Sequence, residues 1–275
     1  MNKWNLSIEQ LKKTAMQIRK DVLVMNNNAG QGHTGADLSE TDILTALYFK
    51  VLSIDPQHPD NPDRDRFILS KGHGVGGLYC TLAKAGFLGK EELKTYLAFD
   101  SHLPGHPVRQ KTPGIEHNTG ALGHGLAVSI GCALAGRMKN KKYRVFVLTG
   151  DGELQEGSVW EAAMAASRFK LDNLTVIVDR NRLQLAGETE TIMPLEPLAD
   201  KWRAFGFDVV EIDGNNMEEI LGALDNSGYS SGKPRVIIAR TVKGRGVSFI
   251  ENNIPWHHKV PTESELIDAL KELEG

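Results

Sequence analysis

Cysteines and long apolar runs are both scarce in this chain. Its 275 residues include two cysteines, Cys80 and Cys132, and both lie in apolar helical patterns where a free cysteine usually acts as a small buried hydrophobe. Two such residues indicate neither a disulfide framework nor a cysteine-based zinc site. No apolar run approaches the roughly 20 residues that a bilayer-spanning helix needs. The sequence therefore argues against a disulfide-rich secreted protein and against a membrane protein.

A strong charge of one sign is missing as well. The formal net charge is -3 although 24% of the residues are charged, so nothing favours nucleic acid or an anionic membrane surface as a partner. The N-terminus does not have the pattern of a signal peptide, because Ser7 to Gln10 form a capping box that opens a helix. We therefore expect a globular protein in the cytoplasm.

The order of apolar segments predicts an α/β fold. Short β-branched runs alternate with helical patterns, which implies a mostly parallel sheet with helices on both faces. Repeats, low-complexity tracts and linkers are not found, so we expect one domain over residues 1–275. A stretch rich in Gly, His and Pro, 101–125, is predicted to be a long loop. The predicted strands are 66–69, 143–148, 174–178, 207–212 and 235–240. The predicted helices include 78–85, 91–99, 126–138, 158–169 and 265–273, and a capping box from Thr262 to Glu265 opens the last of them.

Two polar residues stand just past predicted strands, thirty positions apart. Asp151 follows YRVFVLTG and Asn181 follows LTVIVDR, with a helical crossover between them. In open α/β sheets, ligands bind outside the carboxyl ends of the strands, so both side chains are expected in one crevice. Gly150 and Gly152 would let a phosphate approach the backbone. Hard oxygen ligands suit Mg²⁺ or Ca²⁺, and phosphate oxygens would complete the coordination of the ion. Asp-Gly is also a common turn dipeptide, so spacing alone leaves both the metal site and an ordinary turn open.

Two nucleotide-binding motifs were also considered. Residues 72–77 (GHGVGG) satisfy GxGxxG between a predicted strand and a helix. The dinucleotide fingerprint further requires a second strand that ends in an acidic residue about twenty positions later, whereas here that region is helical in pattern. A GxxxxGK[ST] sequence, which a P-loop needs, does not occur. Nicotinamide and P-loop nucleotide binding are both disfavoured.

Histidines are unusually often preceded by glycine. His33, His73, His106 and His124 all follow a glycine, and His257 and His258 form a further pair in IPWHHKVP. Each alone is most simply a solvated loop residue. Together, on loops at strand ends, they can bind anionic oxygens or carry protons. A zinc site is the rival interpretation, but neither HExxH nor a paired Cys/His spacing is present.

The run GDGELQEGSVWEA, followed by the asparagine of DRNRL, closely resembles the thiamine-diphosphate fingerprint as transketolases carry it. This resemblance extends along most of the chain and implies the thiamine-diphosphate-binding fold, in its diphosphate-binding module. It implies a cation, Mg²⁺ or Ca²⁺, held by Asp151, Asn181 and the carbonyl of Leu183. The histidines implied to act on the substrate or the reacting carbon are His33, His73, His106 and His257. The further residues implied to contact the cofactor are Lys71, His73, Gly120, Ala121, Leu122, Gly152, Lys243 and His257, with Asn181 through the metal and Glu156 at a subunit interface.

Three positions depart from the family pattern. Relatives usually carry two adjacent asparagines where this chain has Arg180 and Asn181, and only the second is expected to reach the metal. Thr34 replaces the usual proline after His33, and Ala36 stands where some members have a serine that contacts the cofactor. These changes concern individual contacts and leave the enzyme class unaffected.

The resemblance also implies a missing partner. Full-length transketolases continue with a second module that carries the glutamate activating the aminopyrimidine, whereas this chain ends at Gly275. We therefore expect one half of a split transketolase, two copies of each subunit, and transfer of a two-carbon ketol unit from a ketose phosphate to an aldose phosphate, as in the pentose phosphate pathway. The alternatives are half of another thiamine-diphosphate enzyme, such as a deoxyxylulose-phosphate synthase relative or a transferase for an unusual sugar, and a non-catalytic cofactor-binding subunit.

Overall fold

The computed structural model describes residues 4–225 and 232–274 and is built around a five-stranded sheet. The strand order is β1-β2-β3-β7-β6, and every neighbouring pair is parallel. The mostly parallel sheet predicted from the sequence is thus confirmed. The strands are β1 (Arg66–Leu69), β2 (Val145–Gly150), β3 (Leu174–Arg180), β6 (Asp208–Asp213) and β7 (Arg235–Arg240), and a separate antiparallel pair comprises β4 (Leu183–Gln184) and β5 (Gly187–Glu188).

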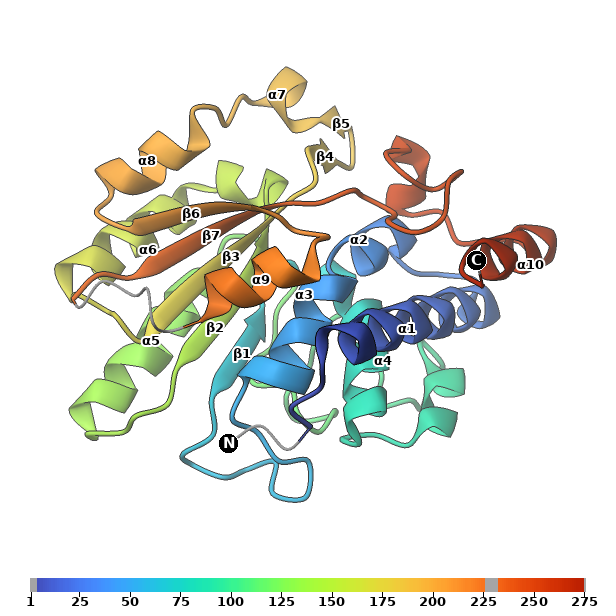
Figure 1. The fold of residues 1–275 in the computed structure, drawn as a ribbon, viewed down its shortest axis with the longest axis horizontal. Coiled ribbons are helices and arrows are strands. Elements are labelled where there is room, and N and C mark those ends of the chain that lie inside the picture. The colour runs from blue at the N-terminus through green and yellow to red at the C-terminus, as the bar shows by residue number, and fades with distance from the viewer. Residues whose placement is uncertain (1–3, 226–231, 275) are drawn as a thin grey trace.

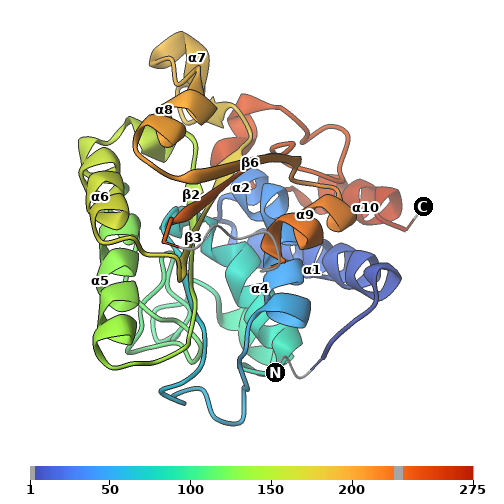
Figure 2. The same ribbon diagram turned by 60° about the vertical axis from the view of Figure 1, so that its left-hand side comes forward.

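Helices cover both faces of the sheet (Figures 1 and 2). Side chains along a strand alternate between the faces, so Val145 and Val147 pack into one apolar core and Phe146 and Leu148 into the other. The first core is covered by α5 (Gly125–Met138), α6 (Gly157–Arg168) and α8 (Leu198–Ala204). The second is covered by α1 (Ile8–Ala29), α2 (Thr34–Ser39), α3 (Thr41–Ala46), α4 (Val75–Ala85), α9 (Met217–Leu224) and α10 (Glu263–Glu272).

Short helices complete the fold. They are the π-helical turn η1 (Leu47–Val51), the 3₁₀ segments η2 (Gly72–Gly74), η3 (Lys90–Thr95), η4 (Gly152–Gln155) and η6 (Ile254–His257), and the short helix α7 (Thr189–Ile192). In the described part of the chain, no helix has both the length and the apolar character to span a membrane.

Both capping boxes expected from the sequence are present. Ser7 caps α1 with Gln10, and Thr262 caps α10 with Glu265, each through reciprocal backbone and side-chain hydrogen bonds. These bonds satisfy amide groups that the first helical turn otherwise leaves unpaired, so they fix where each helix begins. The two helices then pack side by side near the C-terminus (Figure 1).

Several boundaries differ from the prediction. The segment 91–99 forms the short 3₁₀ helix η3 and a turn, and Leu97 adopts a left-handed φ of 62° that a regular helix does not allow. Strand β2 begins at Val145 instead of Tyr143, because Val145 is the first residue that pairs with both β1 and β3. The β4-β5 pair was not predicted at all, since two-residue strands carry no periodicity.

Candidate functional site

The carboxyl ends of four parallel strands meet at one edge of the sheet. Strand β1 leads into Lys71, β2 into Asp151, β3 into Asn181, and β7 into Lys243. They border a cleft of about 370 Å³, lined also by the loop that carries Gly120. Of the residues that the sequence proposed, the cleft brings together His33, Lys71, His73, His106, Gly120, Leu122, Asp151, Gly152, Glu156, Asn181, Leu183, Lys243 and His257, and Ala121 alone is not among its lining residues.

Asp151 is a buried carboxylate with one side already held by the protein. Its Oδ2 accepts from Nη1 of Arg180 at 3.0 Å and from the amide of Arg182 at 2.5 Å. Its Oδ1 accepts only from the neighbouring amide of Gly152, at 2.8 Å. Burial and the nearby charge of Asp179 raise the pKa of Asp151, against the opposing effect of Arg180. A carboxylate in this environment gains stability from a further cation.

Asn181 and Leu183 supply two more oxygens on the same turn. Oδ1 of Asn181 accepts from the amide of Leu183 at 3.1 Å, and the carbonyl of Leu183 accepts from Nζ of Lys243 at 2.9 Å. Because amide and carbonyl oxygens each have two lone pairs, both retain acceptor capacity. Nearby, the buried Oε1 of Gln184 has no hydrogen-bond partner in the described structure. This all-oxygen donor set fits a hard divalent cation with phosphate ligands.

A buried ionic network lies beneath the cleft. Nζ of Lys71 is 2.6 Å from Oδ2 of Asp179 and 2.8 Å from Oε2 of Glu40. Burial opposes the charge on Lys71, but the two carboxylates outweigh it and raise the lysine pKa. Burial likewise opposes ionisation of Asp179, yet Lys71 lowers the pKa of that carboxyl. The ammonium of Lys71 is therefore held by these two carboxylates and by the carbonyl of Ala36, at 3.2 Å.

Glu153 ties the glycine-rich loop to the strand ends. Its carboxylate accepts from the hydroxyl of Ser70 after β1, from the amide of Gly123 at 2.8 Å, and from the amide of Gly150 at 3.1 Å. Burial raises the pKa of Glu153, and these hydrogen bonds oppose that rise. One side chain thus joins three separate segments of the cleft wall.

Close backbone approach explains two glycines in the cleft wall. A Cβ at Gly72 would lie 2.7 Å from the backbone nitrogen of Gly120, closer than such contacts occur. Gly120 itself has a φ of 134°, a left-handed conformation that side chains disfavour, and a Cβ there would meet the ring of His106 at 2.7 Å. These positions keep the loop against the strand ends.

Three imidazoles gather at one side of the cleft. The ring centroid of His33 lies 5.1 Å from that of His73 and 5.7 Å from that of His257, and His73 and His257 are stacked at 5.3 Å. Burial is the main cause that lowers the pKa of His33 to about 4 and of His257 to about 3, and it moves the pKa of His73 well below its usual value. Neutral imidazoles result at neutral pH, and each offers one donor and one acceptor.

Lys243 completes this side of the cleft. Its Nζ lies 2.8 Å from Nδ1 of His257, and burial with the neighbouring Lys71 lowers the lysine pKa to about 8. His106 also lines the cleft, where burial lowers its pKa. The cleft therefore combines anionic oxygens for a cation, one cationic side chain and several neutral proton carriers.

Reasoning from the sequence missed Glu40 and Asp179 in this site, and it missed the contacts that Glu153 makes. Their functional groups act on residues distant in sequence, and no motif spacing marks such contacts. Asp179 had one usable signal, because a carboxylate at the end of a buried strand requires a partner. It also missed the role of His258, which joins His33 and His257 in a group whose potential metal-binding atoms lie within 4.8 Å of one another.

Comparison with known proteins decides the family. Residues 10–275 match the model described as transketolase, thiamine diphosphate binding domain. This chain belongs to the transketolase family. Among curated transketolase relatives, an apulose-4-phosphate transketolase subunit of Actinobacillus succinogenes is 54% identical over 274 residues, which covers 99% of each chain. The 6-deoxy-6-sulfo-D-fructose transketolase subunit SqwG of a Clostridium species is 43% identical and covers 96% of each chain.

Solved transketolases share the same fold. The transketolase of Campylobacter jejuni superposes with a TM-score of 0.92 at 32% identity, over 98% of this chain and 43% of that one. The transketolase of Leishmania mexicana gives a TM-score of 0.90 at 31% identity. The chain thus spans about two fifths of these solved transketolases. The expected fold of the thiamine-diphosphate-binding module is confirmed.

Proposed function

We propose that this chain is one subunit of a split transketolase, that residues 1–275 form a single cofactor-binding domain, and that it binds thiamine diphosphate through a divalent cation. The observation that carries the proposal is the set of hard oxygens from Asp151, Asn181 and Leu183 where β2 and β3 end. Mg²⁺ is the expected ion, and Ca²⁺ would satisfy the same ligands. The cation would offset the repulsion between the diphosphate and the carboxylates of the cleft.

The chain's own side chains would then orient the bound groups. Arg180 and Arg182 hold Oδ2 of Asp151, so Oδ1 would be the oxygen available to the metal. Lys243 supplies a positive charge for the diphosphate, and Gly120 and Leu122 border the aminopyrimidine side. When bound, thiamine diphosphate provides the electron sink for cleavage of a carbon–carbon bond beside a carbonyl.

The histidines are assigned to the substrate. His33, His73, His106 and His257 are neutral because of burial, so they can accept or donate hydrogen bonds to ketose hydroxyls and the carbonyl oxygen. His257 is oriented by Lys243, whose Nζ faces Nδ1 and leaves Nε2 for the substrate. These roles require a ketose substrate whose reacting carbon lies on the imidazole side of the cleft.

A separate subunit is expected to cover the other side of the cofactor. Leu122 and Leu185 line the cleft yet are 36% and 59% exposed, and Met164 on α6 and Met193 beyond α7 are more than half exposed. Exposed apolar side chains at the cleft, here Leu122 and Leu185, favour an association surface. Relatives of the same length are themselves named as subunits of a transketolase, which supports a partner chain. We propose an assembly of two copies of each.

The names of the relatives also narrow the range of candidate donor substrates. Apulose 4-phosphate is the leading candidate, because the relatives named for it are 54% and 46% identical over nearly the whole chain. The sulfonated sugar in the name of the 43% identical relative is the second candidate. The acceptor is expected to be an aldose phosphate.

The test is reconstitution. The chain should show no ketol transfer alone and should transfer a two-carbon unit once its partner subunit, thiamine diphosphate and Mg²⁺ are added, with apulose 4-phosphate preferred over the sulfonated sugar and over an unbranched ketose phosphate. Turnover by the chain alone would refute the split-enzyme proposal. Cofactor binding without transfer from any ketose, in the complete assembly, would indicate the non-catalytic alternative.

A further inference from the structure

His258 adjoins the imidazoles of the cleft and has no role in the proposed ketol transfer. It is exposed at the end of η6, and its ring centroid lies 4.4 Å from that of His33 and 5.0 Å from that of His257. One ring nitrogen from each of the three residues can be chosen so that all lie within 4.8 Å of one another. Three imidazoles converge here from segments more than 200 positions apart in the sequence.

Three converging imidazole nitrogens match the needs of a transition metal. Zinc binds histidine nitrogen at about 2.0–2.1 Å, so a tetrahedral site brings its ligand atoms to roughly 3.4 Å from one another. Closing the present group to that spacing needs a movement of roughly 1.5 Å at most, which an exposed side chain such as His258 makes by rotating about its own bonds. The other two members, His33 and His257, are half-buried.

We propose that His33, His257 and His258 form a transition-metal site, suited to Zn²⁺ with one position left open to water, at the mouth of the cleft. A metal held there uses the nitrogens of His33 and His257 that would otherwise meet a ketose. Occupancy therefore inhibits ketol transfer, and this inhibitory consequence rests on the proposed function.

The state of the side chains supports this assignment. Burial keeps His33 and His257 neutral, and a metal requires an unprotonated nitrogen lone pair. Nδ1 of His257 faces Nζ of Lys243, so Nε2 is the atom available to a metal. On binding, the Nε2 proton is released to solvent and Lys243 passes one proton to Nδ1, so the ring stays neutral and one proton is released overall. The positive charge of Lys243 weakens the site, whereas Asp151 and Glu153 in the same cleft offset part of that effect.

The two metal sites differ in chemistry, which makes them separable. Imidazole ligands favour Zn²⁺, Co²⁺, Ni²⁺ and Cu²⁺, while the oxygens of Asp151, Asn181 and Leu183 favour Mg²⁺ or Ca²⁺. Excess Mg²⁺ should therefore leave the imidazole site free. A substitution of Asp151 removes a nearby charge but no imidazole ligand, so it should lower Zn²⁺ affinity less than His258→Ala does.

The direct test uses the full chain without an affinity tag and without cofactor. Co²⁺ is titrated in millimolar Mg²⁺ while the visible absorption of tetrahedral cobalt is followed, and Zn²⁺ is then added to displace it. We expect a stoichiometric band that Zn²⁺ abolishes. In His258→Ala the metal affinity should fall at least about 10-fold, since even indirect supports of a metal ligand contribute 10- to 100-fold. His117→Ala, which removes another exposed histidine, should behave like wild type.

Two results would overturn the proposal. One is the absence of a cobalt band up to millimolar metal, and the other is an unchanged metal affinity in His258→Ala. The inhibitory part is tested in the assembled enzyme, where micromolar Zn²⁺ should lower the rate reversibly and His258→Ala should keep its activity with less inhibition. Equal inhibition of both would refute it. If no transfer activity is found at all, the proposed function fails, and the cobalt titration still decides the metal site.

Discussion

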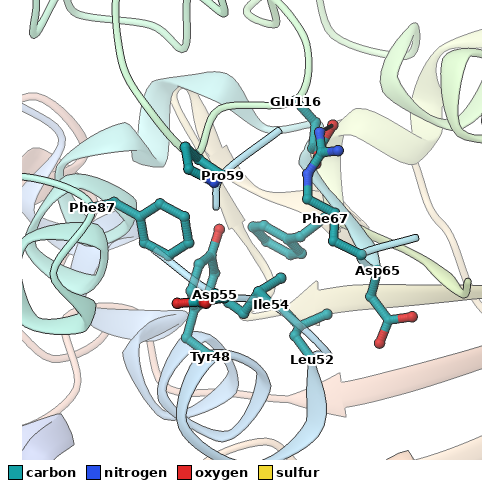
Figure 3. Close-up of a pocket in the computed structure, with 11 residues that line it drawn as sticks. Tyr48, Leu52, Ile54, Asp55, Pro59, Asp65, Phe67, Phe87 and Glu116 are labelled. Carbon is teal, nitrogen blue, oxygen red and sulfur yellow. Dashed lines mark hydrogen bonds and ion pairs between the residues drawn. The ribbon is translucent and has the colours of Figure 1, made fainter. Parts of the chain in front are cut away.

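The two ends of the sheet hold cavities of opposite character. At the carboxyl end, the cleft is lined by carboxylates, imidazoles and a lysine, above a buried ion network. At the amino end, where β1 begins, a small pocket is enclosed by the rings of Tyr48, Phe67 and Phe87 (Figure 3). The space inside is about 20 Å³, enough for about one water molecule.

The surroundings of the charged side chains also differ between the two ends of the sheet. In the aromatic pocket, Glu116 pairs with Arg64 at 2.7 Å at the rim, and burial raises the pKa of Glu116. The rings of Tyr48 and Phe67 meet edge to face with centroids 5.8 Å apart, a packing arrangement typical of cores. In the cleft, by contrast, Asp151 keeps an oxygen with spare acceptor capacity. The comparison teaches that the amino end contributes stability and the carboxyl end keeps groups available for ligands.

The largest expected effect is on stability at the aromatic pocket. Phe67→Ala removes a buried ring from β1 and leaves a cavity, which should lower the free energy of unfolding by about 3–5 kcal/mol. Urea unfolding measures this loss. Cofactor affinity of the folded fraction should stay at the wild-type value. A comparable loss of affinity would break the division between the two ends.

The second expected effect is on catalysis at the cleft. His257→Ala should lower kcat of the assembled enzyme by roughly 10²-fold, the usual contribution of a positioned proton carrier. The midpoint of thermal unfolding should hardly change, because His257 is only partly buried. A large drop in melting temperature with intact specific activity would make His257 structural.

A smaller loss of stability is expected at a glycine that lets two backbone segments approach closely. Gly72→Ala places a Cβ 2.7 Å from a backbone nitrogen and should lower the free energy of unfolding by about 1–3 kcal/mol. Gly131 on α5 is the matched control, because no atom lies within 4 Å of a Cβ there. Gly131→Ala should stabilise the helix by about 0.5–1 kcal/mol. Equal effects of the two substitutions in urea unfolding would refute the close approach.

The smallest expected effect is a dependence of the unfolding free energy on pH. Burial lowers the pKa of His33 from 6.5 to about 4, so below pH 6.5 the unfolded chain takes up a proton that the folded chain refuses. The contribution of this residue to stability is therefore lost as the pH falls from 6.5 towards 4. Asp37, whose pKa burial raises to about 6, gives the opposite slope. The quantity to measure is the difference in unfolding free energy between wild type and His33→Gln, which should grow with pH across this range. A flat difference would contradict the shift.

Much of the fold could be predicted from the sequence because local signals set it. The capping boxes at Ser7 and Thr262 begin helices α1 and α10 as predicted, and five apolar runs give the five strands within two residues at their starts. The strand order could not be predicted, since each run pairs through backbone groups that every residue shares. The 3₁₀ segment η3 was mistaken for a helix because its composition suits both.

The candidate site, like the fold, could be predicted from the sequence only in part. Asp151 and Asn181 were found because each follows a strand, and parallel strands end at the same edge. The triad of Lys71, Glu40 and Asp179 was not found, because its members come from a turn, a helix junction and a strand. Contacts between distant segments depend on tertiary packing, which spacing within one motif does not encode.

The most direct test of the account is calorimetric titration of thiamine diphosphate into the complex of this chain with its partner subunit. Wild type with Mg²⁺ should bind, wild type with the cation chelated should not, and Asp151→Ala with Mg²⁺ should show no detectable heat. Asp268→Ala, which removes an exposed carboxylate from α10, should bind like wild type. Wild-type affinity in Asp151→Ala would contradict the claim that the carboxyl end of the sheet holds the cofactor through a metal on Asp151.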